Sequence, residues 1–456
     1  MRSERTLFGH PTGLAFIVFT EAWERFSFYG MQALLVLYMA THLLHPGNVE
    51  GVVGFTAFRA VIESIFGSLS IQALTAQIFG IYIGLIYLMP VFGGLLGDRL
   101  LGRTRAVLIG AVFMTVGHFL MAIEAAFLFA LLFLILGSGL LKGNLAAQVG
   151  GLYEKADQRR DTAFTLYNVA INVGSTVAPL VCGTLGELYG WHYGFGAAGI
   201  GMLVGIAIYV SGRSHLPPDV SLSLEKTVRR LQPGDLRTIA AILVLILIAA
   251  LFWATQTQVW NTYPLWIKAR VDRVIFDMTM PVTWFQSIDA GSVLLLAPLV
   301  LWLWKRQSAR GSEPDDFRKI IFGYALYAIA FAWLAASEWT AGTGHVALAW
   351  PVLFHLILAA GFLYVGPIMM SLVSRAAPQS VNAMMVSSYY LSIFAGGFLS
   401  GWLGRFYEPL TPAQFWLLHA AIAGAGCLLV LLLRRPLQSA MQLDGRREVN
   451  RASGQP

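Results

Sequence analysis

One long apolar segment near the start of the chain also carries charged residues: TGLAFIVFTEAWERFSFYGMQALLVLYMATH (residues 12–42). A charge at the centre of a bilayer costs about 2.5–3.5 kcal/mol on insertion scales, so charged residues persist there mainly where they face a polar cavity. A helix turns about 100° per residue. One arc of this segment therefore contains Glu21, Glu24, Arg25, Phe28, Tyr29 and Gln32. We expect this arc to face a water-accessible centre rather than lipid.

The composition is that of a membrane protein with many spans. Of the 456 residues, 57% are hydrophobic and 12% are charged, and the mean hydropathy is +0.66. Soluble domains contain about 25% charged residues. Cys182 and Cys427 both lie in apolar runs, so we expect buried thiols and no disulfide. The charges in residues 12–42 are unlike the apolar core of a cleavable signal peptide, so we expect this segment to be retained.

Twelve runs are long enough to cross a bilayer, which takes about 20 residues. They lie near 12–42, 72–96, 105–123, 126–148, 162–185, 194–212, 238–260, 282–304, 319–337, 347–373, 382–404 and 414–433. We predict an all-α membrane protein with two six-helix bundles, 1–212 and 238–434, a cytoplasmic linker at 213–237 and a polar, disordered cytoplasmic tail at 435–456. In such a fold the substrate lies at the midplane between the halves, and rocking exposes it to each side in turn.

The basic residues predict the orientation. With both termini in the cytoplasm, the cytoplasmic segments hold 24 of the 31 Lys and Arg residues and the outer loops hold five. This asymmetry satisfies the positive-inside rule, and it accounts for the formal charge of +7 without nucleic acid as a partner. We expect a multi-pass protein of the cell inner membrane.

Three motifs resemble those of the proton-dependent oligopeptide transporter family. Residues 21–30 (EAWERFSFYG) are similar to its first-helix ExxERF motif, Lys142-Gly143-Asn144 to its fourth-helix element, and residues 164–174 (FTLYNVAINVG) to its fifth-helix signature. Later landmarks follow in the family's order as far as Ala377-Pro378, so the resemblance covers nearly the whole chain.

A further loop, residues 97–105 (GDRLLGRTR), resembles the signature loop of the major facilitator superfamily. Its Asp98 can bridge basic residues or helix ends on the cytoplasmic side and so take part in gating. The alternative is an ordinary basic inner loop.

The resemblance implies a proton-coupled symporter that imports di- and tripeptides, with protons as the coupling ion, no cofactor and no metal. We expect it to be monomeric. The residues agree with this chemistry, because Arg25 and Lys142 can bind a carboxylate. Glu21 and Glu24 can titrate, since burial and a neighbouring cation shift the pKa of a carboxyl in opposite directions. Protonating either would release a cation to hold substrate, and such coupling is reciprocal. The alternative is a static ion network that fixes helix packing.

The resemblance also places aromatic side chains in the pocket, namely Tyr29, Tyr82, Trp253 and Tyr389, and the amide of Asn172 could bind substrate. Each aromatic residue could instead pack in the core or face lipid. Asn172 could instead cap a local kink in the backbone.

The chain departs from the family at the usual acids. The tenth-helix Glu, which would pair with Lys142 and anchor a peptide ammonium, is replaced by Phe362. The family's outer-gate ion pair is replaced by Gln32 and Gln256–Thr257, so we expect the outer gate to close through neutral hydrogen bonds or packing.

Asp289 stands where the family has an eighth-helix Asn. We hypothesise that it replaces the lost acid, either by facing the peptide ammonium or by sharing proton duty with Glu21 and Glu24. Alternatively, it caps a helix break before Ala290-Gly291 or pairs with a basic side chain.

Other functions stay open. The same fold could carry a small anion or an amino-acid derivative, or the chain could be a non-transporting receptor. An enzyme is not expected, because the sequence has no phosphate loop, nucleophile elbow or metal cluster. We expect His118, His345 and His355 to be packed and hydrogen-bonded rather than to carry protons.

Overall fold

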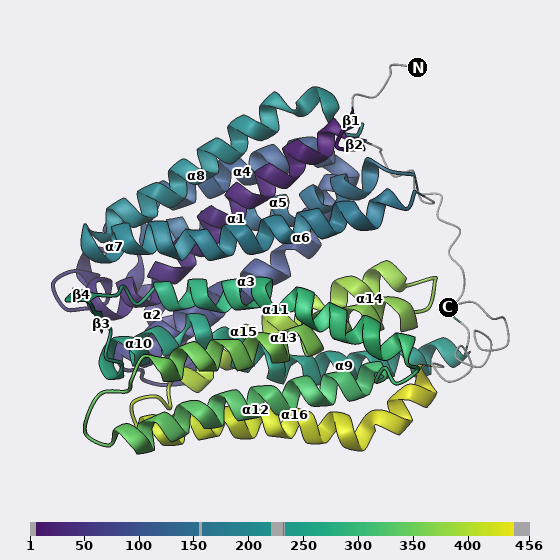
Figure 1. Cartoon of the computed structure of the whole chain (residues 1–456). Coiled ribbons are helices and arrows are strands. Elements are labelled where there is room, and N and C mark those ends of the chain that lie inside the picture. Colours follow the sequence, from purple (N-terminus) through teal and green to yellow (C-terminus); the bar gives the residue numbers. More distant parts are fainter. Residues whose placement is uncertain (1–5, 155–156, 220–230, 232, 442–456) are drawn as a thin grey trace.

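The computed structural model describes residues 6–154, 157–219, 231 and 233–441, and their helices form two bundles (Figure 1). The first bundle contains α1 (Thr12–Tyr38), α2 (Phe55–Phe66), α3 (Ile71–Leu96), α4 (Arg103–Leu120), α5 (Phe127–Gly151), α6 (Arg159–Ala178), α7 (Thr184–Leu188) and α8 (Trp191–Ser211). The second contains α9 (Pro233–Gln256), α10 (Thr262–Arg270), α11 (Trp284–Ala309), α12 (Asp316–Ala341), α13 (Ala349–Ala376), α14 (Asn382–Ser388), α15 (Tyr390–Gly404) and α16 (Pro412–Ala440).

Short helical turns and two small hairpins join these helices. The turns are η1 (Met39–Leu43), η2 (Val49–Gly51), η3 (Gly97–Leu101), η4 (Glu124–Ala126), η5 (Pro179–Gly183), η6 (Arg213–His215) and η7 (Thr257–Trp260). The antiparallel hairpins pair β1 (Thr6–Leu7) with β2 (His10–Pro11) and β3 (Val274–Ile275) with β4 (Met278–Thr279). A helix satisfies all of its interior backbone hydrogen bonds within one segment, which a bilayer requires. The chain is therefore a multi-pass, all-α membrane protein.

A helix lies at each of the twelve predicted spans. In the part of the chain that the structure describes, nine helical segments are long and apolar enough to cross a membrane. The other predicted spans are α1, which carries the charged residues, α4, and the pair α14–α15, which divides at Tyr389. The number of twelve spans therefore stays a prediction.

Two predicted boundaries are wrong. α9 begins at Pro233, inside the predicted linker, and α16 continues to Ala440, inside the predicted disordered tail. Hydropathy marks only the part of a helix that lies in the bilayer, whereas the hydrogen-bonded backbone can continue into water. The remainder of the predicted linker and tail, 220–230, 232 and 442–456, lies outside the described residues. Cys182 is buried and free as expected, but Cys427 is only partly buried.

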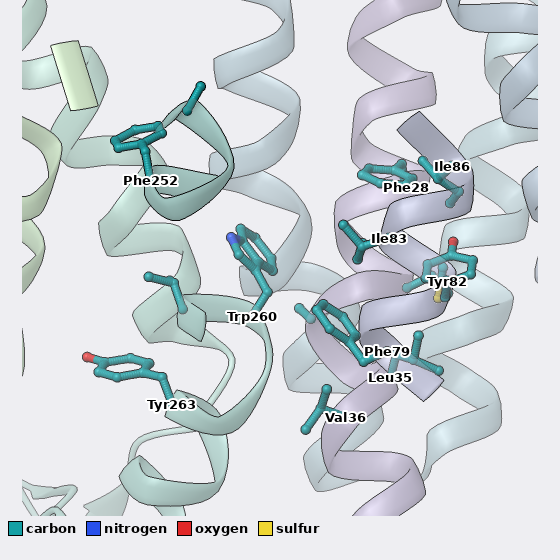
Figure 2. Close-up of a cluster of buried hydrophobic side chains, with 14 of the residues drawn as sticks. Phe28, Leu35, Val36, Phe79, Tyr82, Ile83, Ile86, Phe252, Trp260 and Tyr263 are labelled. Carbon is teal, nitrogen blue, oxygen red and sulfur yellow. The ribbon is translucent and has the colours of Figure 1, made fainter. Parts of the chain in front are cut away.

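The bundles meet at the end that holds α2, α7, α10 and the β3–β4 hairpin, which we call the distal end. The terminal end, where α1 begins and α16 finishes, lies opposite (Figure 1). α3 and α15 approach closely at glycines, since a Cβ on Gly80 would lie only 2.5 Å from the carbonyl oxygen of Gly397. Asn261 donates a 3.3 Å hydrogen bond across the interface to the carbonyl of Ala76. Figure 2 shows Trp260 of the second bundle between the ribbons of the two bundles, and its ring centroid lies 5.3 Å from that of Tyr29 on α1.

Candidate functional site

The predicted charged cluster forms on α1 and is buried. Nε of Arg25 lies 3.0 Å from Oε1 of Glu21, one turn earlier, and Arg25 also forms an ion pair with Glu24. The hydroxyl of Tyr167, on α6, donates a 2.6 Å hydrogen bond to Oε2 of Glu21. Close approach of α6 is possible because Gly174 has no side chain, and a Cβ there would lie 2.5 Å from the carbonyl oxygen of Ala22. Nη2 of Arg25 is buried and has no hydrogen-bond partner in the described chain.

α5 places the second predicted cation, Lys142, beside this cluster. Its Nζ lies 4.0 Å from the ring centroid of Phe28 and 4.8 Å from that of Tyr87. This amine is buried, and within the described residues it has no hydrogen-bond partner. Phe362 lies elsewhere, with its ring centroid 6.3 Å from that of Trp253. Lys142 therefore holds a buried amine against aromatic faces, without a hydrogen-bond partner among the described residues.

Two adjoining cavities lie between the bundles. The Lys142 cavity has a volume of about 330 Å³, and its polar lining includes Glu21, Arg25, Lys142, Tyr167, Ser387 and Tyr390. The Asp289 cavity has a volume of about 150 Å³, and its lining includes Gln32, Asn172, Trp253, Gln256, Thr257, Asp289 and Phe362. Tyr29 and Tyr87 line both cavities, so they mark the boundary where the two adjoin.

Asp289 is the acid of the second cavity. Its Oδ1 lies 3.4 Å from Nδ1 of His355, and its Oδ2 lies 3.5 Å from Nε2 of Gln256. In the described chain no Lys or Arg lies within ion-pair distance of this carboxylate, and His355 is its basic neighbour. The alternative of a helix break before Ala290 is wrong, because α11 continues unbroken from Trp284 to Ala309.

Two predicted pocket residues do not line either cavity. Tyr82 is buried on the side of α3 away from Trp260, while its neighbour Ile83 faces Trp260 (Figure 2). Tyr389 is buried, and its hydroxyl donates a 3.4 Å hydrogen bond to the carbonyl of Gly366, while Tyr390 lines the Lys142 cavity instead. In both cases the adjacent residue faces the cavity because neighbours along a helix point about 100° apart. Glu24 also lies behind the lining, where it pairs with Arg25.

The predicted outer-gate residues line the Asp289 cavity without bonding to one another. Oε1 of Gln32 has no hydrogen-bond partner among the described residues. The hydroxyl of Thr257 donates to the carbonyl of Trp253, and Gln256 accepts from the hydroxyl of Tyr327. Of the two expected forms of closure, hydrogen bonds between these neutral residues are absent from the described structure, and closure through packing stays a prediction.

The distal end is instead closed partly by a charged residue, Glu187, at the end of the first bundle. Its carboxylate accepts hydrogen bonds from the backbone nitrogens of Val282 (2.9 Å) and Thr283 (2.8 Å) at the start of α11. Trp284 adds a 2.8 Å bond from its indole nitrogen to the hydroxyl of Thr184. Carboxylates suit the positive end of a helix.

The loop that contains Asp98 is held by two carboxylates. Oδ1 of Asp98 lies 2.9 Å from Nε of Arg103, so Asp98 forms an ion pair with a basic residue of the same loop. Asp219, in the described part of the linker, accepts hydrogen bonds from the backbone nitrogen (3.0 Å) and the hydroxyl (3.2 Å) of Thr104. The linker is thereby tied to the start of α4.

Sequence reasoning missed several residues of the site. Tyr167 lies within the fifth-helix motif, and Tyr87 lies on α3 one helical turn after Ile83, which lines the same cavity. Both could have been found by projecting these segments onto a helix. Glu187 carried no such signal, and His355 was expected to be hydrogen-bonded but without a named partner, because the partners of both residues come from distant parts of the chain.

Comparison with known proteins gives the class and then the family. The buried charges between two helical bundles define a transporter-like membrane protein with the major facilitator fold. The crystal structure of a peptide transporter POT in complex with sulfate matches it with a TM-score of 0.80 and 27% identity, over 96% of this chain and 97% of that one. The family model described as the POT family matches residues 104–223 and 220–417. The chain belongs to the POT family.

Curated relatives match along nearly their whole length. The peptide transporter YePEPT of Yersinia enterocolitica is 28% identical over an alignment 506 residues long, and the match covers 94% of this chain and 95% of that protein. A di-/tripeptide transporter of Lactococcus lactis is 27% identical over an alignment 508 residues long, and the match covers 96% of this chain and 98% of that protein. The uncharacterized transporter YclF of Bacillus subtilis is 28% identical over an alignment 501 residues long, and the match covers 96% of this chain and 97% of that protein.

Proposed function

We propose that this protein is a proton-coupled symporter that imports di- and tripeptides by alternating access. One observation carries the proposal: basic side chains line one of the two adjoining cavities, and an acid lines the other. Arg25 and Lys142 line the first together with Glu21, while Asp289 lines the second without a Lys or Arg partner in the described chain. A short peptide is a zwitterion with a carboxylate at one end and an ammonium at the other, so it complements this arrangement. The relatives named as peptide transporters support the same substrate class.

The Lys142 cavity binds the peptide carboxylate. Arg25 offers a planar fork of donors, of which Nη2 has no hydrogen-bond partner in the described structure, and Lys142 offers a point charge. Hydrogen bonds to charged groups contribute about 1.5–3 kcal/mol. The aromatic walls, which include Tyr29, Tyr87 and Tyr390, exclude water and strengthen these interactions.

Glu21 couples the proton to this binding step. While ionised, it competes with the substrate carboxylate for Arg25, at a distance of 3.0 Å. A proton on Glu21 removes that competition, and Glu24 remains to balance Arg25. Proton binding therefore favours peptide binding, and peptide binding favours protonation by the same factor. Glu24 and Asp289 are further candidates for proton exchange.

The Asp289 cavity binds the peptide ammonium. Asp289 supplies the charge, Asn172 supplies a polar side chain, and Trp253 supplies an aromatic face. Phe362 replaces an acid with apolar surface on the same cavity. Asp289, in place of the acid lost at Phe362, thus takes part in substrate recognition as well as in proton transfer.

Orientation and gating follow from the same scheme. We infer an inner-membrane protein, monomeric, with both termini in the cytoplasm, so that the distal end faces outward and is closed in this conformation. Gln32, Gln256, Thr257 and Phe362 form the wall of the cavity beneath that closure, and Asp98 acts at the cytoplasmic loop. Protons are the coupling ion, and the scheme includes no catalytic step.

Uptake into liposomes tests the proposal. The protein is reconstituted, an inward proton gradient is imposed, and uptake of labelled dialanine is measured against unlabelled competitors. Di- and tripeptides should compete, whereas nitrate and free amino acids should not. Competition by nitrate or by amino-acid derivatives, without competition by peptides, would assign the site to the second candidate, a small anion or a modified amino acid.

A further inference from the structure

A hydrogen-bonded chain of buried groups runs from the Asp289 cavity into the second bundle. Nδ1 of His355, on α13, lies 3.4 Å from Oδ1 of Asp289, and its Nε2 lies 2.9 Å from the hydroxyl of Tyr263, on α10. The side chain of His355 is 0% exposed and that of Asp289 is 10% exposed. Asp289 lines the cavity and His355 does not, so their contact links the buried histidine to the cavity.

Both protonation states of His355 satisfy its ring nitrogens. In the neutral ring Nδ1–H donates to Asp289, while Nε2 accepts from the hydroxyl of Tyr263. In the charged ring both nitrogens donate, and the hydroxyl rotates to accept from Nε2. The imidazole can therefore gain or lose a proton without leaving a buried ring nitrogen unpaired, which would cost about 1–3 kcal/mol.

The groups around Asp289 and His355 leave the negative charge of Asp289 to be balanced by a single cation. The titratable groups that face Asp289 or His355 from the neighbouring helices are Tyr263 on α10, Tyr327 on α12 and Tyr29 on α1. Within the described residues no Lys or Arg pairs with Asp289. A charged His355 can balance this carboxylate from behind, or a cation in the cavity can balance it from the front.

We propose that Asp289 and His355 form a second proton site, at which a proton competes with the ammonium group of the substrate. This inference rests on the proposed peptide function and deepens it. An imidazolium and an ammonium on either side of one buried carboxylate repel each other. Binding of the ammonium therefore expels the proton from His355, and a proton on His355 weakens ammonium binding by the same factor.

This site acts in the opposite sense to Glu21. A proton on Glu21 favours binding of the peptide carboxylate, whereas a proton on His355 opposes binding of the peptide ammonium. The α-amino group of a peptide has a pKa near 8, so it stays charged between about pH 5 and pH 7, where histidine ordinarily titrates. Affinity for a peptide with a free amine should fall toward acid relative to affinity for its N-acetyl analogue.

The test measures the affinities of the full-length protein in lipid nanodiscs for dialanine and for N-acetyl-dialanine between about pH 5 and pH 7. Taking their ratio cancels the contribution of Glu21, because both ligands keep the carboxylate. In the wild-type protein the preference for the free amine should fall at least about tenfold toward acid, and His355→Gln should abolish this pH dependence. His419→Gln is the matched control, because His419 is also buried but bonds to the carbonyl of Phe415.

The outcomes separate the two proposals. An unchanged pH dependence of the ratio in folded His355→Gln protein overturns the second proton site alone. If the wild-type protein binds no peptide at all, the proposed function fails and this inference fails with it. Proton release on dialanine binding, measured in weak buffer, gives a second readout: it should decrease in His355→Gln and persist in His419→Gln.

Discussion

Oε1 of Glu187 lies 2.8 Å from both the backbone nitrogen and the hydroxyl of Thr283, and these bonds join the last turn of α7 in one bundle to the start of α11 in the other. A helix start leaves backbone N–H groups without partners inside the helix. The carboxylate supplies those partners across the bundle interface. When the distal end opens, these bonds must break, so Glu187 contributes directly to the balance between the two conformations.

Glu187→Gln should therefore favour opening of the distal end. A hydrogen bond to a charged acceptor contributes about 1.5–3 kcal/mol, which corresponds to a shift of about 10- to 100-fold in the population ratio. Spin labels at the exposed positions Tyr189 and Met278 would report the separation of the bundles. Glu63→Gln is the control, because Glu63 bonds within its own bundle, to Arg59 and Leu69. Equal distance distributions in the two variants would contradict the role of Glu187.

The glycine contact between α3 and α15 makes a steric prediction. A Cβ on Gly80 would meet the backbone of Gly397 and Gly401, neither of which is a flexible side chain. Gly80→Ala should prevent close approach of the helices, populate the open distal end and slow uptake. Gly94→Ala, on the same helix, places its Cβ where no atom lies within 4 Å and should transport like the wild type. The pair is compared by initial uptake rate and by the same spin labels, and equal rates would refute the steric role of Gly80.

Lys142 should determine the preference for a free carboxylate. Lys142→Gln should reduce affinity for dialanine by about 10- to 100-fold, since it removes a charge-assisted interaction of about 1.5–3 kcal/mol. Affinity for dialanine amide, which has no carboxylate, should change little. Competition binding measures both ligands, with Lys268→Gln, an exposed lysine on α10, as the control. A loss of affinity of the same size for both ligands would show that Lys142 does not recognise the carboxylate.

Helical periodicity explains why the cluster on α1 could be predicted. Glu21, Arg25, Tyr29 and Gln32 are spaced by three or four residues, so they share a face, and each of them lines a cavity. The buried charges also required a polar centre, and the motifs identified the family. The bundle architecture followed from the spans and their order.

Other features depended on rotation and docking, which the sequence pattern does not specify. A motif matched at Tyr82 or Tyr389 fixes the helix but not which of two adjacent residues faces the cavity, and Ile83 and Tyr390 took those places. The bond between Glu187 and Thr283 joins residues from different bundles, so it exists only once the bundles have docked. His355 shows the same limit, since its partners lie on α10 and α11.

The most direct test of the account is proton-driven accumulation by Glu21→Gln protein in liposomes. A potential of about 100 mV supplies about 2.3 kcal/mol per unit charge, enough for roughly 50-fold accumulation. Wild-type protein should concentrate labelled dialanine and lose it when an uncoupler is added. Glu21→Gln protein should still exchange internal for external dialanine but should not concentrate it. Accumulation by Glu21→Gln at the wild-type level would contradict the claim that this buried carboxyl couples protons to the substrate.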